Sequence, residues 1–280
     1  MRTVQVLDYL HRKGFRKSLS FLSQLAYWLK GFGYVKSTYH PSFRAYEYKV
    51  RGVVYLSLGP GWAYTFDYLS TLLRNNFGYH YMPQPGDCVI DIGAGLGEET
   101  VLYALLVGKE GSVHSLEANP STFAGLKYLC EQNKFSWVVP HHLAIYKEDG
   151  VVTIEDDEEN YLTNTIHKEP VHKKGHQVEA MKLDTFVEKN GITEIDFLKS
   201  NIEGAEQFLI QGMDNSIRMI RHLCISCHDF RQVYHQHGEF YMTLGKVRSF
   251  LEEKGFEITM RSTGNHATDN YIYARNPAMR

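Results

Sequence analysis

Apolar residues in the first part of the chain recur at intervals that predict helix first and strand afterwards. Through residues 1–35 they fall three and four positions apart with Lys and Arg between them, which is typical of an amphipathic helix. Gly31-Phe32-Gly33 ends this segment. Residues 43–58 alternate in the manner of a strand, and residues 64–75 return to helical spacing. The pattern predicts an N-terminal extension that is helical and rich in aromatic residues.

From residue 88 onward, short apolar runs alternate with segments of helical spacing. A turn cluster at 83–87 separates this part from the extension. Strands are predicted at 88–92, 112–117, 137–143, 151–155, 177–183, 195–199 and 222–227. Helices are predicted at 98–107, 121–133, 184–190, 205–211 and 241–254, and an antiparallel pair at 256–260 and 270–274. This alternation builds a doubly wound α/β fold, with a mostly parallel sheet and helices on both faces.

We place one boundary in the chain, between an accessory region of residues 1–80 and a main domain of residues 81–280. Of the 280 residues, 43% are apolar and 22% charged, as in ordinary globular proteins. The net charge of −2 does not indicate a nucleic-acid partner. The charge is uneven, however. Residues 1–50 hold nine Lys and Arg against Asp8 and Glu47, so they carry +7 and the remainder carries −9.

The cysteines and the apolar stretches indicate where in the cell the protein is expected. The four cysteines are too few and too scattered for a disulfide framework. Cys224 and Cys227 have the spacing of a metal or redox motif, but they fall on a predicted strand, where residues three apart point to opposite faces. We interpret them as buried thiols in a reducing compartment. The longest apolar stretch, 21–29, is too short to cross a bilayer, and no secretory signal is recognised. We expect a cytoplasmic location.

A glycine-rich turn joins the strand at 88–92 to the helix at 98–107. It reads Asp91-Ile-Gly-Ala-Gly-Leu-Gly97, and glycine suits a tight turn that a ligand approaches without an intervening Cβ. A dinucleotide site would have its third glycine where Glu98 stands, and a carboxylate there would repel a pyrophosphate. S-adenosylmethionine has no phosphate, and its positive groups would gain from a carboxylate such as Asp91. The turn therefore favours S-adenosylmethionine.

An acidic residue follows at the spacing expected of a ribose ligand. Glu117, 26 residues after Asp91, ends the predicted strand at 112–117, where a carboxylate can accept hydrogen bonds from both ribose hydroxyls of an adenosine. Asn119-Pro120 then marks a helix start, with Asn as the cap and Pro at the first position. The predicted cofactor-binding residues are Asp91, Gly93, Ala94, Gly95, Gly97, Glu117, Ala118 and Asn119.

On these motifs the chain resembles the FkbM-type methyltransferases. The family pattern has a first motif like DxGAxxG, an acidic ExNP after the second strand, and a sequence like DFLKIDVEGAE after the fourth. The corresponding segments here are 91–97, 117–120 and 196–206, and the likeness covers roughly residues 50–275. The resemblance implies a Rossmann-like class I methyltransferase fold and S-adenosylmethionine as cofactor. It also implies O-methylation of a hydroxyl on a sugar or other small metabolite.

Three residues near the predicted carboxyl edge of the sheet are candidates for catalysis. Asn201 and Glu203 follow the strand at 195–199, and ligands of open α/β sheets bind outside this edge. We predict that they hold the acceptor or the cofactor's ammonium; the alternative for Glu203 is to stabilise a helix N-terminus. His228 follows the strand at 222–227, and we predict it to be the base that removes the proton of the acceptor hydroxyl.

Asn201 also bears on metal dependence. The resemblance implies an Asp at this position, and in related sugar O-methyltransferases acidic residues nearby hold a divalent metal. Asn is a weaker, neutral ligand, so we predict no metal site. In the alternative, metal-dependent case the ligands would be Asn201, Glu203 and Asp229.

Two other functions and two roles of the N-terminus stay open. A nicotinamide-dependent oxidoreductase is disfavoured by Glu98, and a non-catalytic nucleoside-binding protein is suggested only by Asn201. The expected partner is a small-molecule hydroxyl acceptor and not a nucleic acid; the sequence does not indicate an oligomeric state. For residues 1–35 we favour a lid over the acceptor pocket, and the alternative is a helix that lies on an anionic membrane.

Overall fold

A seven-stranded sheet forms the centre of the computed structural model, which describes residues 9–11, 13–29, 31, 35–59, 66–155, 166–167 and 175–279. Its strands are β4 (Cys88–Ile92), β5 (Ser112–Glu117), β6 (Val138–His142), β11 (Ile195–Ser200), β12 (Ile220–Ser226), β13 (Glu257–Thr259) and β14 (Tyr271–Arg275). Their order is β13-β14-β12-β11-β4-β5-β6. The strands from β12 to β6 run parallel, and β14 runs antiparallel to both of its neighbours.

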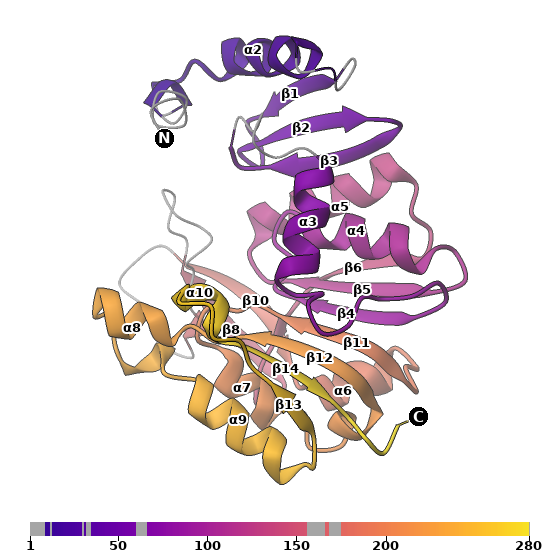
Figure 1. Cartoon of the computed structure of the whole chain (residues 1–280), viewed down its shortest axis with the longest axis vertical. Helices are drawn as coiled ribbons and strands as arrows, with labels where there is room; N and C mark the ends of the chain where they lie inside the picture. Colours follow the sequence, from indigo (N-terminus) through magenta and orange to yellow (C-terminus); the bar gives the residue numbers. More distant parts are fainter. Residues whose placement is uncertain are drawn as a thin grey trace.

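Helices cover both faces of this sheet (Figure 1). On one side lie α3 (Phe66–Asn75), α4 (Glu98–Val107) and α5 (Pro120–Asn133); on the other lie α6 (Leu183–Lys189), α7 (Glu206–Gln211) and α9 (Leu244–Glu253). Strand side chains alternate between the two sides: Val89 and Phe197 join the apolar cluster of the first group, and Ile90 and Leu198 that of the second. The predicted doubly wound α/β fold is confirmed.

The N-terminal region adds a sheet and a helix above α4 and α5 (Figure 1). An antiparallel sheet is formed by β1 (Lys36–His40), β2 (Ala45–Val50) and β3 (Val53–Ser57), and α2 (Arg16–Leu29) packs on β1. Residues 43–58 are thus a hairpin and not one strand, because Arg51 and Gly52 turn the chain with φ of +48° and +86°. Asn133 of α5 fixes the sheet by bonding both the N–H and the carbonyl of Val54, at 2.8 and 2.7 Å.

A second, smaller sheet follows β6 in the sequence and contacts the central sheet through β5. It consists of β7 (Ala144–Ile145), β8 (Gly150–Glu155), β9 (Ile166–His167) and β10 (Gly175–Met181), in the order β7-β10-β8-β9. Two predicted strands, 151–155 and 177–183, therefore lie outside the central sheet. β8 and β10 pair antiparallel with each other, whereas neighbouring strands of a parallel sheet need a crossover connection.

The C-terminal half differs from the prediction in detail. The helix predicted from residue 241 begins at Leu244, and residues 239–241 form a 3₁₀ turn. Two short helices, α8 (Asp229–His235) and α10 (His266–Asp269), were not predicted.

Cys224 and Cys227 are both buried and free. No helix in the described part of the chain is long and apolar enough to cross a membrane.

Candidate active site

A cavity of about 200 Å³ lies at the carboxyl ends of β4, β5 and β11, beside the small sheet. Parallel α/β sheets bind their ligands at this edge. Seven of the predicted site residues line the cavity: Gly93, Gly95, Glu117, Ala118, Asn119, Asn201 and Glu203. Four predicted residues do not line it: Asp91, Ala94, Gly97 and His228. The structure thus brings both predicted groups, the cofactor and the acceptor residues, to one place.

The turn between β4 and α4 brings its backbone close to β11. Gly93 has φ +73°, and a Cβ there would lie 2.1 Å from the carbonyl oxygen of Asn201. Only glycine tolerates both the left-handed conformation and this close approach. Gly95 has φ +57°, but a Cβ there would meet nothing within 4 Å. At Gly95 the turn therefore faces the open space of the cavity.

Asp91 lies beneath the turn and not in the cavity. Its side chain is 0% exposed, its Oδ1 is 2.9 Å from Nζ of Lys199, and its Oδ2 accepts a hydrogen bond from Thr100. Lys199 also donates to the carbonyl of Gly93 at 2.8 Å. Burial lowers the pKa of Lys199, but the carboxylates of Asp91 and Glu99 outweigh it and leave the pKa raised. The predicted contact of Asp91 with the cofactor is corrected: the carboxylate holds the turn through Lys199, which sequence reasoning missed.

Glu117 stands at the end of β5 with both carboxylate oxygens held by backbone amides. Gly95 N–H donates to Oε2 at 2.7 Å and Asn119 N–H to Oε1 at 2.8 Å. Burial raises the pKa of Glu117, and these hydrogen bonds lower it in part. Each carboxylate oxygen keeps a further lone pair for a donor in the cavity. The remaining wall is mostly apolar and includes Leu116, Leu143, Ile145, Ile154 and Ile202.

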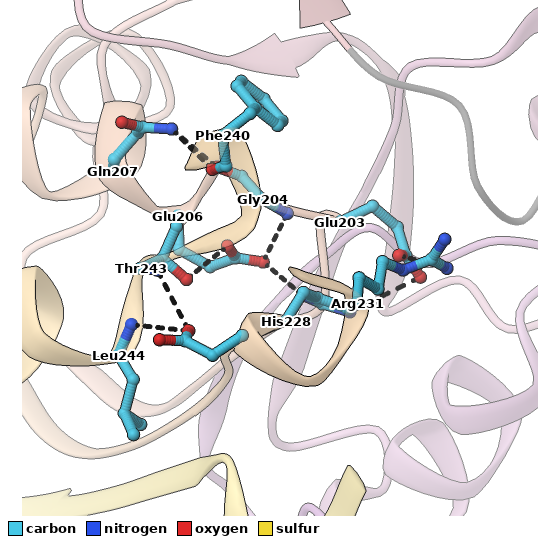
Figure 2. A network of polar contacts seen from close by, with 10 residues as sticks. Glu203, Gly204, Glu206, Gln207, His228, Arg231, Phe240, Thr243 and Leu244 are labelled. Carbon is cyan, nitrogen blue, oxygen red and sulfur yellow. Dashed lines mark hydrogen bonds and ion pairs between the residues drawn. The ribbon is translucent and has the colours of Figure 1, made fainter. Parts of the chain in front are cut away.

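Glu203 forms the opposite wall, after β11. It is one of the few described non-glycine residues with a left-handed backbone, at φ +56°, and it is followed by Gly204 at φ +96°. Such strain persists only where the surroundings hold it. Arg231 of α8 provides that restraint, with Nη2 2.6 Å from Oε2 of Glu203, and His228 Nε2 lies 3.4 Å from Oε1 (Figure 2).

His228 lies behind Glu203, between two carboxylates. Its Nδ1 is 2.8 Å from Oε1 of Glu206, and the two side chains are 3% and 0% exposed. Glu206 also accepts hydrogen bonds from Gly204 N–H at 3.2 Å and from Thr243 Oγ1 at 3.0 Å (Figure 2). Burial lowers the pKa of His228, but Glu206 and Glu203 outweigh it and raise the pKa to about 10.

The charge state of His228 bears on its predicted role as a base. With a pKa of about 10 the ring is an imidazolium at neutral pH; Nδ1 donates to Glu206, and Nε2 lies at ion-pair distance from Glu203. A base needs a free nitrogen lone pair, and this arrangement leaves none. In this geometry His228 contacts Glu203 and Glu206 and does not line the cavity.

The candidate metal ligands Asp229 and Glu203 already have hydrogen-bond or ion-pair partners. Asp229 Oδ2 accepts hydrogen bonds from the backbone N–H groups of Thr243 and Leu244, at 3.0 and 2.9 Å, at the start of α9. Glu203 is paired with Arg231. Within the described residues, no group of three or more His, Cys, Asp or Glu is arranged to hold a metal ion.

Glu98 does not line the cavity, and its charge differs from the one assumed from the sequence. Burial, and then the neighbouring Glu99, raise the pKa of Glu98 to about 8. A carboxyl group that is mostly protonated at neutral pH repels an anion only weakly. The argument against a dinucleotide therefore cannot rest on Glu98.

Comparison with known families settles the class. Residues 91–258, more than half of the chain, match the methyltransferase FkbM domain. The chain belongs to the FkbM methyltransferase family. This confirms the resemblance drawn from the three motifs, and the domain match contains all of them. Its members are S-adenosylmethionine-dependent methyltransferases, as the motifs implied.

Three proteins that are similar to this FkbM-family chain are each at most 24% identical to it. Methyltransferase 1 of Beauveria bassiana is 23% identical over 207 residues, which is 65% of this chain and 77% of that protein. The AMB antimetabolite synthetase AmbE of Pseudomonas aeruginosa is 24% identical over 160 residues, 56% of this chain but 7% of the synthetase. Methyltransferase FkbM of Methylobacillus flagellatus superposes with a TM-score of 0.47 and 17% identity, over 70% of this chain and 45% of that one. This chain thus spans less than half of that structure and a small part of the synthetase.

Proposed function

We propose that this chain transfers a methyl group from S-adenosylmethionine to a hydroxyl of a sugar or other small metabolite. The observation that carries the proposal is the cavity itself, which has Glu117 on one wall and Asn201 and Glu203 on the other. Bringing two reactants together in one geometry is the main requirement of a displacement reaction.

The residues at the Glu117 end fit the cofactor. The free lone pairs of Glu117 suit two ribose hydroxyls, and the apolar wall beside it suits an adenine ring. Gly95 leaves space over the turn for the methionine part. When bound, the cofactor supplies a methyl group on a positively charged sulfur, which is a good leaving group.

The residues at the Glu203 end fit the acceptor. Asn201 and Glu203 both carry oxygens that can accept a hydrogen bond from an acceptor hydroxyl. Arg231 and the His228 imidazolium fix the Glu203 carboxylate from behind, so its orientation is set before the acceptor arrives. We therefore assign to Glu203 the acceptance of the hydrogen bond from the hydroxyl and, as the O–CH₃ bond forms and the S–CH₃ bond breaks, of the hydroxyl proton. His228 holds Glu203 in place.

The test is methyl transfer from radiolabelled S-adenosylmethionine to a panel of acceptors. Monosaccharides and other polyols are compared with amines and thiols of similar size, and the position of the methyl group is read by mass spectrometry. We expect label on a hydroxyl oxygen. Label on nitrogen or sulfur alone would contradict O-methylation, and cofactor binding without transfer to any acceptor would favour a non-catalytic nucleoside-binding protein.

A further inference from the structure

The outermost helix of the N-terminal region exposes its apolar side. On α2, Phe21, Trp28 and Leu29 are 66%, 64% and 69% exposed, and Leu22 and Leu25 are exposed as well. At 3.6 residues per turn these five positions fall within a sector of about 120°. They form one continuous stripe, which we call the outer stripe.

The opposite side of α2 is the one that contacts the protein, and it is more polar. Its buried positions are Leu19, Ser20, Ser23 and Tyr27. Tyr27 shares a hydrogen bond with Tyr55 of β3 at 3.0 Å, and Gln24 donates to the carbonyl of Ser37 at 3.3 Å. A surface helix of a globular protein normally points its apolar face inward. Here the arrangement is reversed, so the exposed stripe is not a by-product of core packing.

The surroundings of the outer stripe are basic. Lys13, Lys17 and Lys36 are exposed near α2, and Lys17 lies on the edge of the stripe about 40° from Phe21. The only acidic residue among the described residues from 9 to 59 is Glu47, which is bound to His40 and Tyr128. Over residues 1–50 the sequence carries +7, whereas the rest carries −9. A binding partner that complements this surface electrostatically must carry negative charge.

We propose that the outer stripe of α2 docks on an anionic lipid bilayer. An exposed aromatic and leucine face flanked by lysines is what an interfacial helix uses, since its apolar side chains enter the boundary of the acyl chains and its cations meet the headgroups. A second copy of this chain is disfavoured because two such surfaces would bring like charges together. The inference goes beyond the proposed function and does not depend on it.

The position of α2 agrees with this orientation. α2 packs on one side of the β1–β3 sheet, and α4 and α5 lie on the opposite side (Figure 1). None of the described residues before Ile92 lines the cavity. The sequence favoured a lid over the acceptor pocket, but α2 does not contact the cavity. We therefore prefer the alternative, in which α2 lies on a membrane.

The first experiment measures co-sedimentation of the full chain with vesicles. Phosphatidylcholine vesicles are compared with vesicles of phosphatidylcholine and phosphatidylglycerol in equal parts. We expect binding to the anionic vesicles that weakens steeply between about 0.1 and about 0.5 M salt. Trp28→Glu should weaken it by at least about tenfold, while Val151→Glu, at an exposed apolar position of β8, should leave it unchanged. Both positions are exposed, so circular dichroism should show folded protein in each case.

The second experiment separates the charge from the apolar stripe. Lys13→Glu with Lys17→Glu should weaken binding to anionic vesicles about tenfold or more. The matched control, Lys109→Glu with Lys254→Glu, changes the net charge equally at exposed positions elsewhere and should have little effect. Absence of binding by the wild type, or equal effects of the two double variants, would overturn the proposal. The proposal would also be overturned if sedimentation equilibrium showed a dimer of the wild type and a monomer of Trp28→Glu. The outer stripe would then bind a second copy of the chain.

Discussion

The two ends of the cavity are built in different ways. At the Glu117 end, the carboxylate is held by backbone N–H groups of Gly95 and Asn119, which stand close to it in the folded turns. At the Glu203 end, the carboxylate is held by charged side chains of α8 and of the residue before it, with Glu206 and Thr243 behind them (Figure 2). Backbone geometry supports the first end and a buried charge network supports the second. Substitutions should therefore affect them independently.

The largest effect is expected from breaking the network behind Glu203. Glu206→Ala removes the nearest carboxylate of the His228 imidazolium, and both side chains are almost fully buried. Breaking a buried charged pair from one side costs about 3–5 kcal/mol. Urea unfolding should show a free energy of unfolding lower by this amount. The control Glu252→Ala, in an exposed pair with Arg248, should change it by less than about 1 kcal/mol.

The next effect concerns turnover. His228→Ala should lower kcat about 10²-fold, because Glu203 loses a partner that fixes its orientation. Binding of S-adenosylhomocysteine should be preserved, since His228 does not line the cavity. In the wild type, kcat should not rise with the deprotonation of a group near pH 6.5. A rise in that range that His228→Ala abolishes would restore the role of His228 as a base.

The network should also leave a signature in the pH dependence of stability. The pKa of His228 is about 10 in the folded protein and ordinarily 6.5. Stabilisation by the charged ring is then fully present below pH 6.5 and is lost as the pH rises toward 10. The difference in unfolding free energy between wild type and His228→Ala should shrink across this window. A difference that stays constant would show that the ring is not preferentially charged in the folded state.

The smallest effect is expected from chelation. Asn201 is neutral, Asp229 binds the start of α9 and Glu203 is paired with Arg231, so none of them is a free anionic metal ligand. EDTA should change turnover by less than about twofold. Complete loss of activity, restored by Mg²⁺, would instead make these three residues metal ligands.

The difference between the two ends also explains what the sequence could reveal. The glycine turn, Glu117 and the Asn119 cap are local features, since strand, turn and helix start follow one another along the chain. They were predicted. Asn119 indeed accepts hydrogen bonds from the N–H groups of Ser121 and Thr122. Local spacing was sufficient for this end because the groups that hold the Glu117 carboxylate are backbone N–H groups of the adjacent turns.

The other end depends on contacts that spacing does not encode. Arg231 lies on α8, a helix of 7 residues that buries none of them. Phe230, Val233 and Tyr234 do fall at helical spacing, but this run is too short to distinguish a helix from a loop by pattern alone, so the helix was not predicted. Beneath the glycine turn, at the first end, Lys199 and Asp91 do carry a signal that was overlooked: each is a charged residue inside an apolar strand, and the two strands are neighbours. Buried charges of opposite sign on adjacent strands must pair, because burial of either alone is costly.

The most direct test of the account is a calorimetric titration of S-adenosylhomocysteine into three variants beside the wild type. Glu117→Ala should weaken binding by about 1–3 kcal/mol, because the ribose hydroxyls lose a charged acceptor. His228→Ala and the exposed control Glu131→Ala should bind as the wild type does. If Glu117→Ala folds and binds with unchanged affinity, or if His228→Ala loses binding equally, the assignment of the cofactor to the Glu117 end is contradicted.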